Sequence, residues 1–69
     1  MTKSTSQKIG ENMRRIRIEK NMSQGDICRK MGLDRSYVSN VENGKQNLTL
    51  STIEKIAEVL EVDVIQLIK

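Results

Sequence analysis

The sequence predicts an all-α fold, a compact five-helix bundle, and three observations support it. Apolar residues recur every three or four positions along most of the chain, the spacing of one helix face. No run of useful length alternates apolar and polar residues as a strand would. A residue type that commonly caps helices stands before each apolar stretch. The 69 residues leave room for one domain, and we expect a flexible N-terminus at 1–5 and a domain at 6–69.

The first helix is expected over residues 7–20. Ile9, Met13 and Ile16 follow helical spacing in this stretch. Ser6 stands where a hydroxyl can accept from the first free backbone N–H groups, so it is the expected N-cap. The stretch therefore has one apolar side to bury.

Two short helices are expected next. Ser23 caps the first of them, and Asp26 three residues later resembles a capping box with the shorter acid. Gly32 ends this helix, because a close turn needs positive φ or a backbone without a nearby Cβ. Asp34 caps the following helix, which ends before Gly44. The inner residues of the two helices are Ile27, Cys28, Met31, Val38 and Val41.

Two more helices complete the chain. Thr49 is the expected cap of a fourth helix that ends near Leu60, and Asp63 caps a last short helix at 64–68. The inner face of the fourth helix consists of Leu50, Ile53, Ile56, Ala57 and Leu60.

The charge is unevenly distributed. The net charge is +3, with a basic excess in residues 1–22 and an acidic excess in residues 48–69. A basic first third indicates contact with a polyanion, while ordinary solvated helix faces are the alternative explanation.

The composition argues against several classes of function. The chain has one cysteine, Cys28, and no histidine, so an internal disulfide and ordinary zinc-binding spacings are absent. We expect no metal, no cofactor and no small-molecule ligand. An enzyme is not expected either, because there is no histidine, no glycine-rich phosphate loop and too small a core for a substrate pocket. A redox role for Cys28 lacks a partner, and packing is its default role.

Residues 23–44 fit the physical demands of a helix-turn-helix. Its first helix needs a small residue where the second crosses it, and Cys28 fills that place. Its turn needs a glycine, which Gly32 provides, and its second helix needs the inward aliphatic residues Val38 and Val41. The outward face must be polar, and the residues there are Arg35, Ser36, Ser39 and Asn40.

With these features, the sequence resembles the phage-repressor/Cro-like (Xre-type) helix-turn-helix family over almost its whole length. The matching segments are IGENMRRIRIEKNMSQGDICRKMGLDRSYVSNVENGK and LTLSTIEKIAEVLEVD. The phrase LDRSYVSNVENGKQNLTL is also similar to the small controller proteins of restriction–modification systems. The resemblance implies a transcriptional regulator that binds double-stranded DNA, with a recognition helix at 34–42 in the major groove.

The resemblance also implies residue roles. Arg35 and Ser36 open the recognition helix toward base edges, and arginine suits guanine because its fork matches O6 and N7. Gln24 stands where the family places a glutamine against a DNA phosphate, supported by its backbone N–H. The alternative for Arg35 is a contact with a phosphate or an ordinary surface charge. The alternative for Gln24 is an ordinary position on the helix surface. Asn40 could read adenine or contact a phosphate, and Ser39 is a weaker candidate of the same kind.

The remaining expected DNA contacts are to phosphates. Lys45, Gln46 and Asn47 follow the recognition helix, where the family's loop lies along the DNA backbone. Tyr37 is the one aromatic residue of the chain. Its hydroxyl is expected to reach a phosphate, and a place at the edge of the core is the alternative for its ring.

The resemblance implies a structural ion pair and a dimer. Arg17 and Glu42 occupy positions that the family pairs as a largely buried ion pair. Proteins of this type commonly bind as two-fold homodimers to roughly palindromic operators. The apolar residues crowded near the C-terminus are the expected interface: Leu60, Val62, Val64, Ile65 and Ile68.

Another function remains open. An antitoxin-like or other protein-interaction module can use the same fold, but no dedicated partner-binding extension is visible. The N-terminus has no apolar signal region, and no run approaches membrane-spanning length. We therefore expect a cytoplasmic protein that is associated with the nucleoid when it binds DNA.

Overall fold

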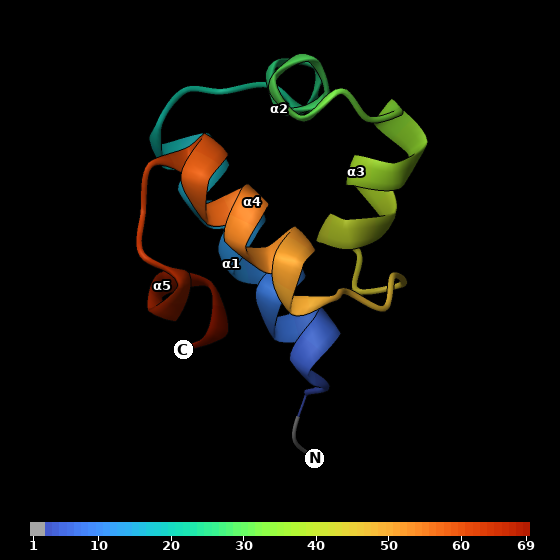
Figure 1. Ribbon diagram of the computed structural model, residues 1–69, viewed down its shortest axis with the longest axis vertical. Helices are drawn as coiled ribbons and strands as arrows, with labels where there is room; N and C mark the ends of the chain where they lie inside the picture. The colour runs from blue at the N-terminus through green and yellow to red at the C-terminus, as the bar shows by residue number, and fades with distance from the viewer. Residues whose placement is uncertain (1–2) are drawn as a thin grey trace.

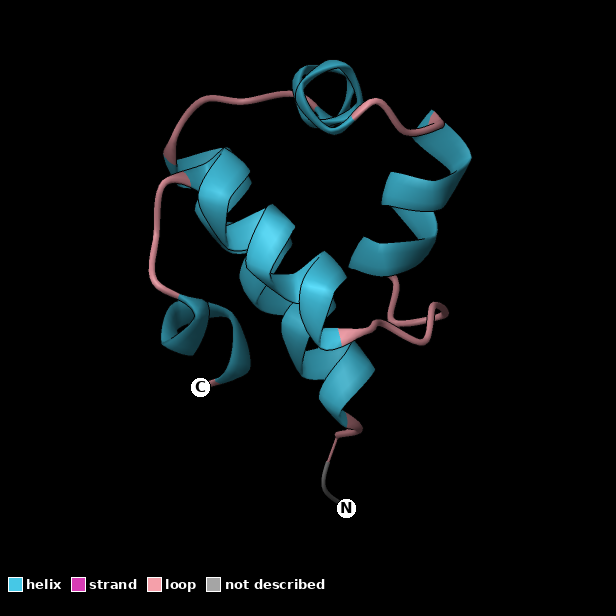
Figure 2. Ribbon diagram, viewed as in Figure 1, coloured by secondary structure: helices cyan, strands magenta, loops and turns pink. Residues whose placement is uncertain are grey.

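The computed structural model describes residues 3–69, which contain five α-helices and no strand (Figures 1 and 2). The predicted all-α, five-helix fold is confirmed. The helices are α1 (Thr5–Glu19), α2 (Gln24–Met31), α3 (Arg35–Glu42), α4 (Leu50–Leu60) and α5 (Val64–Ile68). No helix in the described part of the chain is long and apolar enough to cross a membrane.

Helix α1 is the central element of the bundle. It contacts α3 on one side and α5 on the other, and α4 also packs against it (Figure 1). Helix α2 contacts both α3 and α4; in Figure 1 it lies at the top, with α3 beside it on the right. The recognition helix expected from the sequence therefore depends on α1 and α2 for its position.

The first helix begins earlier than expected. Its N-cap is Ser4, whose hydroxyl accepts from the Gln7 backbone N–H at 3.1 Å while the Gln7 side chain accepts from the Ser4 N–H at 2.9 Å. The expectation of Ser6 as the cap is wrong, because the residue three positions after Ser6 is Ile9, which has no side-chain acceptor to complete a capping box. Of the N-terminus expected to be flexible at 1–5, Thr5 belongs to α1 and Ser4 is its N-cap, and residues 1–2 lie outside the described structure.

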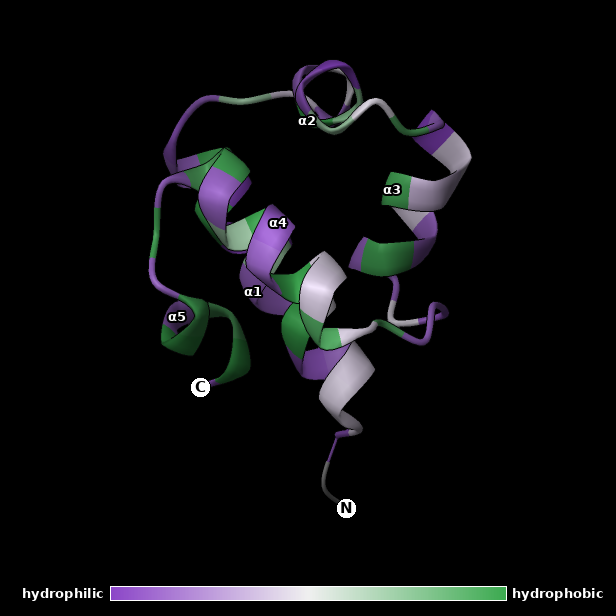
Figure 3. Ribbon diagram, viewed as in Figure 1, coloured by the Kyte–Doolittle hydropathy of each residue, from purple (hydrophilic) through white to green (hydrophobic). Residues whose placement is uncertain are grey.

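The core consists of the residues that share the inner faces of the helices. Figure 3 shows hydrophobic segments on α1, α3, α4 and α5. The fully buried large side chains are Ile9, Met13, Ile27, Ile56, Leu60, Leu67, Val38 and Val41. Cys28 is half-buried and packs against this core, as does Leu33 in the turn. Leu50, which was expected to face inward, is exposed because it begins α4 outside the packed region.

Gly10 allows α1 and α3 to approach closely. A Cβ atom at Gly10 would lie 2.3 Å from the Val41 carbonyl oxygen and 2.7 Å from the Glu42 carbonyl oxygen. Both oxygens belong to the backbone of the last turn of α3, so they cannot move aside as a flexible side chain can. The missing side chain at Gly10 therefore sets how closely the C-terminal end of α3 packs on α1.

Gly10→Ala is expected to lower the free energy of unfolding by about 1–3 kcal/mol, because the added methyl group overpacks the contact between the two helices. Urea unfolding monitored by circular dichroism measures this change. Gly25→Ala is the matched control, because a Cβ there meets only side-chain atoms at 3.5 Å. It is expected to stabilise the protein by up to ~1 kcal/mol through helix propensity. Equal effects of the two substitutions would contradict this account of Gly10.

Candidate nucleic-acid interface

Helices α2 and α3 form the predicted helix-turn-helix. Ser23 caps α2, and its hydroxyl accepts from the Asp26 backbone N–H at 3.0 Å. Gly32 ends α2 in the left-handed conformation, with φ of 66°. The chain then turns, and Asp34 precedes α3 in an extended conformation, although its side chain makes no capping hydrogen bond. The turn between the helices thus depends on a conformation that glycine adopts readily.

Five of the expected DNA contacts line one hollow on the surface of α2 and α3. The hollow has a volume of about 420 Å³, and its lining residues are Gln24, Arg35, Ser36, Ser39 and Asn40. Arg35, Ser36 and Asn40 are exposed, while Gln24 and Ser39 are half-buried. All four side chains expected to contact bases are therefore on one face, together with one expected to contact a phosphate.

The other expected phosphate contacts lie outside this hollow. Tyr37 is half-buried and packs against the core, which agrees with the core alternative for its ring. The loop after α3 is attached directly to that helix, because the Lys45 backbone N–H donates to the Asn40 carbonyl at 2.9 Å. Lys45 and Asn47 are exposed, and Gln46 is half-buried.

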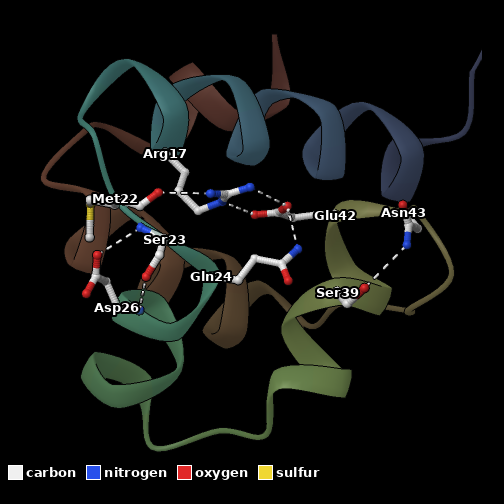
Figure 4. A network of polar contacts seen from close by, with 8 residues as sticks. All are labelled: Arg17, Met22, Ser23, Gln24, Asp26, Ser39, Glu42 and Asn43. Atoms are coloured by element: carbon white, nitrogen blue, oxygen red, sulfur yellow. Dashed lines mark hydrogen bonds and ion pairs between the residues drawn. The ribbon is translucent and has the colours of Figure 1, made fainter.

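A buried ion pair joins α1 to α3 (Figure 4). Arg17 Nε lies 2.7 Å from Glu42 Oε2, and Arg17 Nη2 donates to Glu42 Oε1 at 3.2 Å. The side chains of Arg17 and Glu42 are only 12% and 3% exposed. Arg17 also donates from Nη1 to the Met22 carbonyl at 2.8 Å, just before α2 begins. Arg17 thus contacts the chain just before α2 and at the end of α3, the two ends of the helix-turn-helix.

Gln24 belongs to the same network, which the sequence analysis did not predict. Its Nε2 donates to Glu42 Oε1 at 3.0 Å (Figure 4). A carboxylate only accepts hydrogen bonds, so Gln24 must present its amide NH₂ group to Glu42. One of the amide hydrogens is therefore used within the protein. A glutamine at the start of a helix carries no sequence signal for a glutamate 18 residues away, and only the fold brings the two together.

The expected subunit-interface residues divide into three groups. Leu60 is fully buried in the core, so its expected place in an interface is wrong: its inner position on α4 is covered by the same chain. Val62 and Val64 are half-buried and pack against the core. Ile65 and Ile68 are 54% and 44% exposed, and these two side chains remain available for a partner.

The described residues contain no group of three or more cysteine or carboxylate side chains that could hold a metal ion. The environment of Asp26 changes the pKa of its carboxyl group. The backbone N–H of Ser23 donates to its carboxylate at 2.8 Å. That bond, the Ser23 hydroxyl and the charge of the neighbouring Arg29 together lower the pKa of Asp26 below its ordinary value.

Known helix-turn-helix proteins are similar to this chain in sequence and in structure. A family model described as helix-turn-helix matches residues 13–67. A hypothetical transcription factor of Neisseria meningitidis is 49% identical over 60 residues, which cover 87% of this chain and 57% of that protein. Control protein C.BamHI of Bacillus amyloliquefaciens is 40% identical over 63 residues, which cover 90% of this chain and 78% of that protein. The chain thus spans little more than half of the Neisseria relative and over three quarters of C.BamHI.

Two solved structures of restriction–modification controller proteins are also similar. C.AhdI from Aeromonas hydrophila superposes with a TM-score of 0.83 at 39% identity, covering 90% of this chain and 94% of that chain. The C.Esp1396I tetramer in complex with its natural 35-base-pair operator gives a TM-score of 0.82 at 38% identity, covering 94% and 87% of the two chains.

Arg17→Met is expected to destabilise the protein by about 3–5 kcal/mol, because it leaves the Glu42 charge buried without its main partner. Thermal or urea unfolding measures the loss. Lys3→Met is the matched control, since Lys3 pairs with Glu11 at 2.7 Å between exposed side chains and such pairs contribute at most about 1 kcal/mol. The double variant Arg17→Met/Glu42→Met should recover much of the loss, and a double variant as unstable as Arg17→Met would contradict the burial argument.

Asp26→Asn is expected to change the pH dependence of stability. Because folding lowers the pKa of Asp26, its stabilising effect is complete above the unfolded value, about 3.9, and is lost as pH falls through the folded value. Urea unfolding between about pH 2 and pH 6 should show wild type more stable than the variant at the upper end and the two curves converging in acid. A difference independent of pH would contradict this role.

Proposed function

Since the chain belongs to the Xre-like helix-turn-helix family, we propose that it is a sequence-specific regulator of transcription that binds double-stranded DNA as a homodimer. The observation that carries this proposal is the hollow that Gln24 and four residues of α3 line together. An α-helix fits the major groove of B-DNA, where each base pair presents a distinct set of hydrogen-bonding groups. A polar, exposed face on a short helix is suited to reading those groups.

In this proposal α3 lies in the major groove. Arg35 contacts guanine, because the guanidinium fork matches O6 and N7. Ser36 and Asn40 are one helical turn apart on the same exposed face and contact neighbouring bases. Ser39 contributes less, because it is half-buried and its hydroxyl accepts from the side chain of Asn43, the residue that follows α3, at 3.5 Å.

The phosphate contacts flank this base-reading face. The backbone N–H of Gln24, at the start of α2, and its remaining amide hydrogen both donate to phosphate. The loop residues Lys45, Gln46 and Asn47 extend the contact along the DNA backbone, with Lys45 supplying the positive charge. Tyr37 donates through its hydroxyl while its ring packs on the core, which reconciles the two roles considered for it.

A homodimer places two copies of α3 on DNA. Half-sites about 34 Å apart put both recognition helices on one face of the duplex, which requires a roughly palindromic operator. C.Esp1396I is a tetramer in complex with its operator. We propose that this chain also binds DNA as an oligomer, namely as a homodimer. We propose a binding function without catalysis, carried out in the cytoplasm on the nucleoid.

Selection of bound sequences from a random pool of duplex DNA tests the function. Recovery of a palindromic consensus, bound with an affinity that falls steeply with salt, is the expected result. Recovery of no consensus, or an affinity that does not respond to salt, would favour the protein-interaction alternative.

Arg35→Ala is expected to relax the preference at one base pair of each half-site by about 1–3 kcal/mol while leaving nonspecific binding nearly intact. Lys45→Ala is the matched control. It should weaken binding to all sequences alike and reduce the slope of log affinity against log salt concentration by about one. Fluorescence anisotropy with the selected operator and its single-base variants measures both. A uniform loss in Arg35→Ala would mean that Arg35 binds phosphate.

A further inference from the structure

Helix α5 is a short element whose position depends on the rest of the protein. It has five residues, Val64–Ile68, and its N-cap Asp63 makes no side-chain capping hydrogen bond. A helix of this length is not stable alone in water. Its anchor is Leu67, which is fully buried in the core. Tertiary contacts therefore set the orientation of α5.

One side-chain hydrogen bond supplements this anchor. Asn12 Nδ2, on α1, donates to the Leu67 carbonyl oxygen at 2.6 Å. Among residues 3–69 no other side-chain hydrogen bond reaches α5. The Asn12 amide is itself oriented from the other side, since its Oδ1 accepts from Arg15 Nη2 at 3.3 Å. The bond joins residues 55 positions apart and fixes the last turn of α5 against the middle of α1.

The opposite side of α5 is apolar and exposed. Ile65 and Ile68 are three residues apart and share one face, and both are about half exposed. Helix α5 is hydrophobic along most of its length in Figure 3 and contains no charged residue. Two copies of this face can meet without bringing like charges together, so a second copy of the chain is the occupant that it fits.

We infer that Asn12 is a positioning residue for the subunit contact: by holding Leu67 it orients α5 so that Ile65 and Ile68 meet a second copy. This inference rests on the homodimer of the proposed function. On helix α1, Asn12 contacts α5, whereas Gly10 and Arg17 contact α3. It therefore links the subunit contact to the recognition helix and sets the separation of the two copies of α3.

Sedimentation equilibrium of wild type and Asn12→Ala tests this inference. The dimer dissociation constant should rise by about five- to tenfold in the variant, as for the loss of one hydrogen bond. Binding of single protomers to an isolated half-site should change by less than about twofold, because the Asn12 side chain bonds to α5 and to Arg15 and makes no hydrogen bond to the recognition helix. On the full operator, the variant should also tolerate altered spacing between half-sites better than wild type.

Val38→Ala is the control for a purely structural effect. It removes buried volume on α3, which has no substantial contact with α5, so it lowers stability without changing the subunit contact. Its dimer dissociation constant should stay within about twofold of wild type. Asn12→Asp is the second variant, in case Asn12→Ala destabilises the fold, because it keeps the shape of the side chain and replaces the donor by an acceptor.

Three results would overturn the inference. If wild type dimerises and the Asn12 variants dimerise as tightly, then Asn12 has no role in the subunit contact, and the proposed function stays intact. Equal weakening by Val38→Ala would reduce the role of Asn12 to general stability. A wild-type chain that stays monomeric on and off its operator would refute the homodimer itself.

Discussion

The arrangement of the DNA-binding unit depends on the buried contact between Arg17 and Glu42. The guanidinium of α1 makes two hydrogen bonds to the last residue of α3 and a third to the chain before α2. Desolvating two charges is unfavourable, so such a pair adds little net stability compared with apolar packing. Its directional bonds instead restrict how α3 is oriented relative to α1, which packing of aliphatic side chains alone does less strictly. Gln24 extends the same restriction to α2.

Close backbone packing complements these directional bonds. At Gly10, α1 meets the final carbonyl groups of α3 without a side chain between them, next to the point where Arg17 reaches Glu42. The position of the recognition helix is thus set at its C-terminal end, while its N-terminal residues face the solvent. The C-terminal end of α3 therefore fixes the orientation of the helix, while its N-terminal end is accessible from solvent.

Most of the fold could be predicted from the sequence, because apolar spacing and caps are local signals. The helix-turn-helix followed from Cys28, Gly32 and two valines for the same reason. The errors concern choices that local sequence leaves open: Ser4 and Ser6 are both capping residues, and the sequence does not distinguish Leu60, which is buried, from Ile65, which is exposed. Gln24 and Asn12 were not linked to their partners, since those contacts join residues far apart in sequence. The roles at DNA remain predictions.

The exposed polar face of α3 has a consequence for how such a protein can diverge. Within residues 3–69, no side-chain hydrogen bond or ion pair engages Arg35, Ser36 or Asn40. Substitutions at these three positions therefore disturb no packing or network that the fold requires. In the proposed function these side chains read bases, so mutation can change the set of recognised sequences almost independently of foldability, and such a protein can acquire a new operator in single steps, each from a folded ancestor.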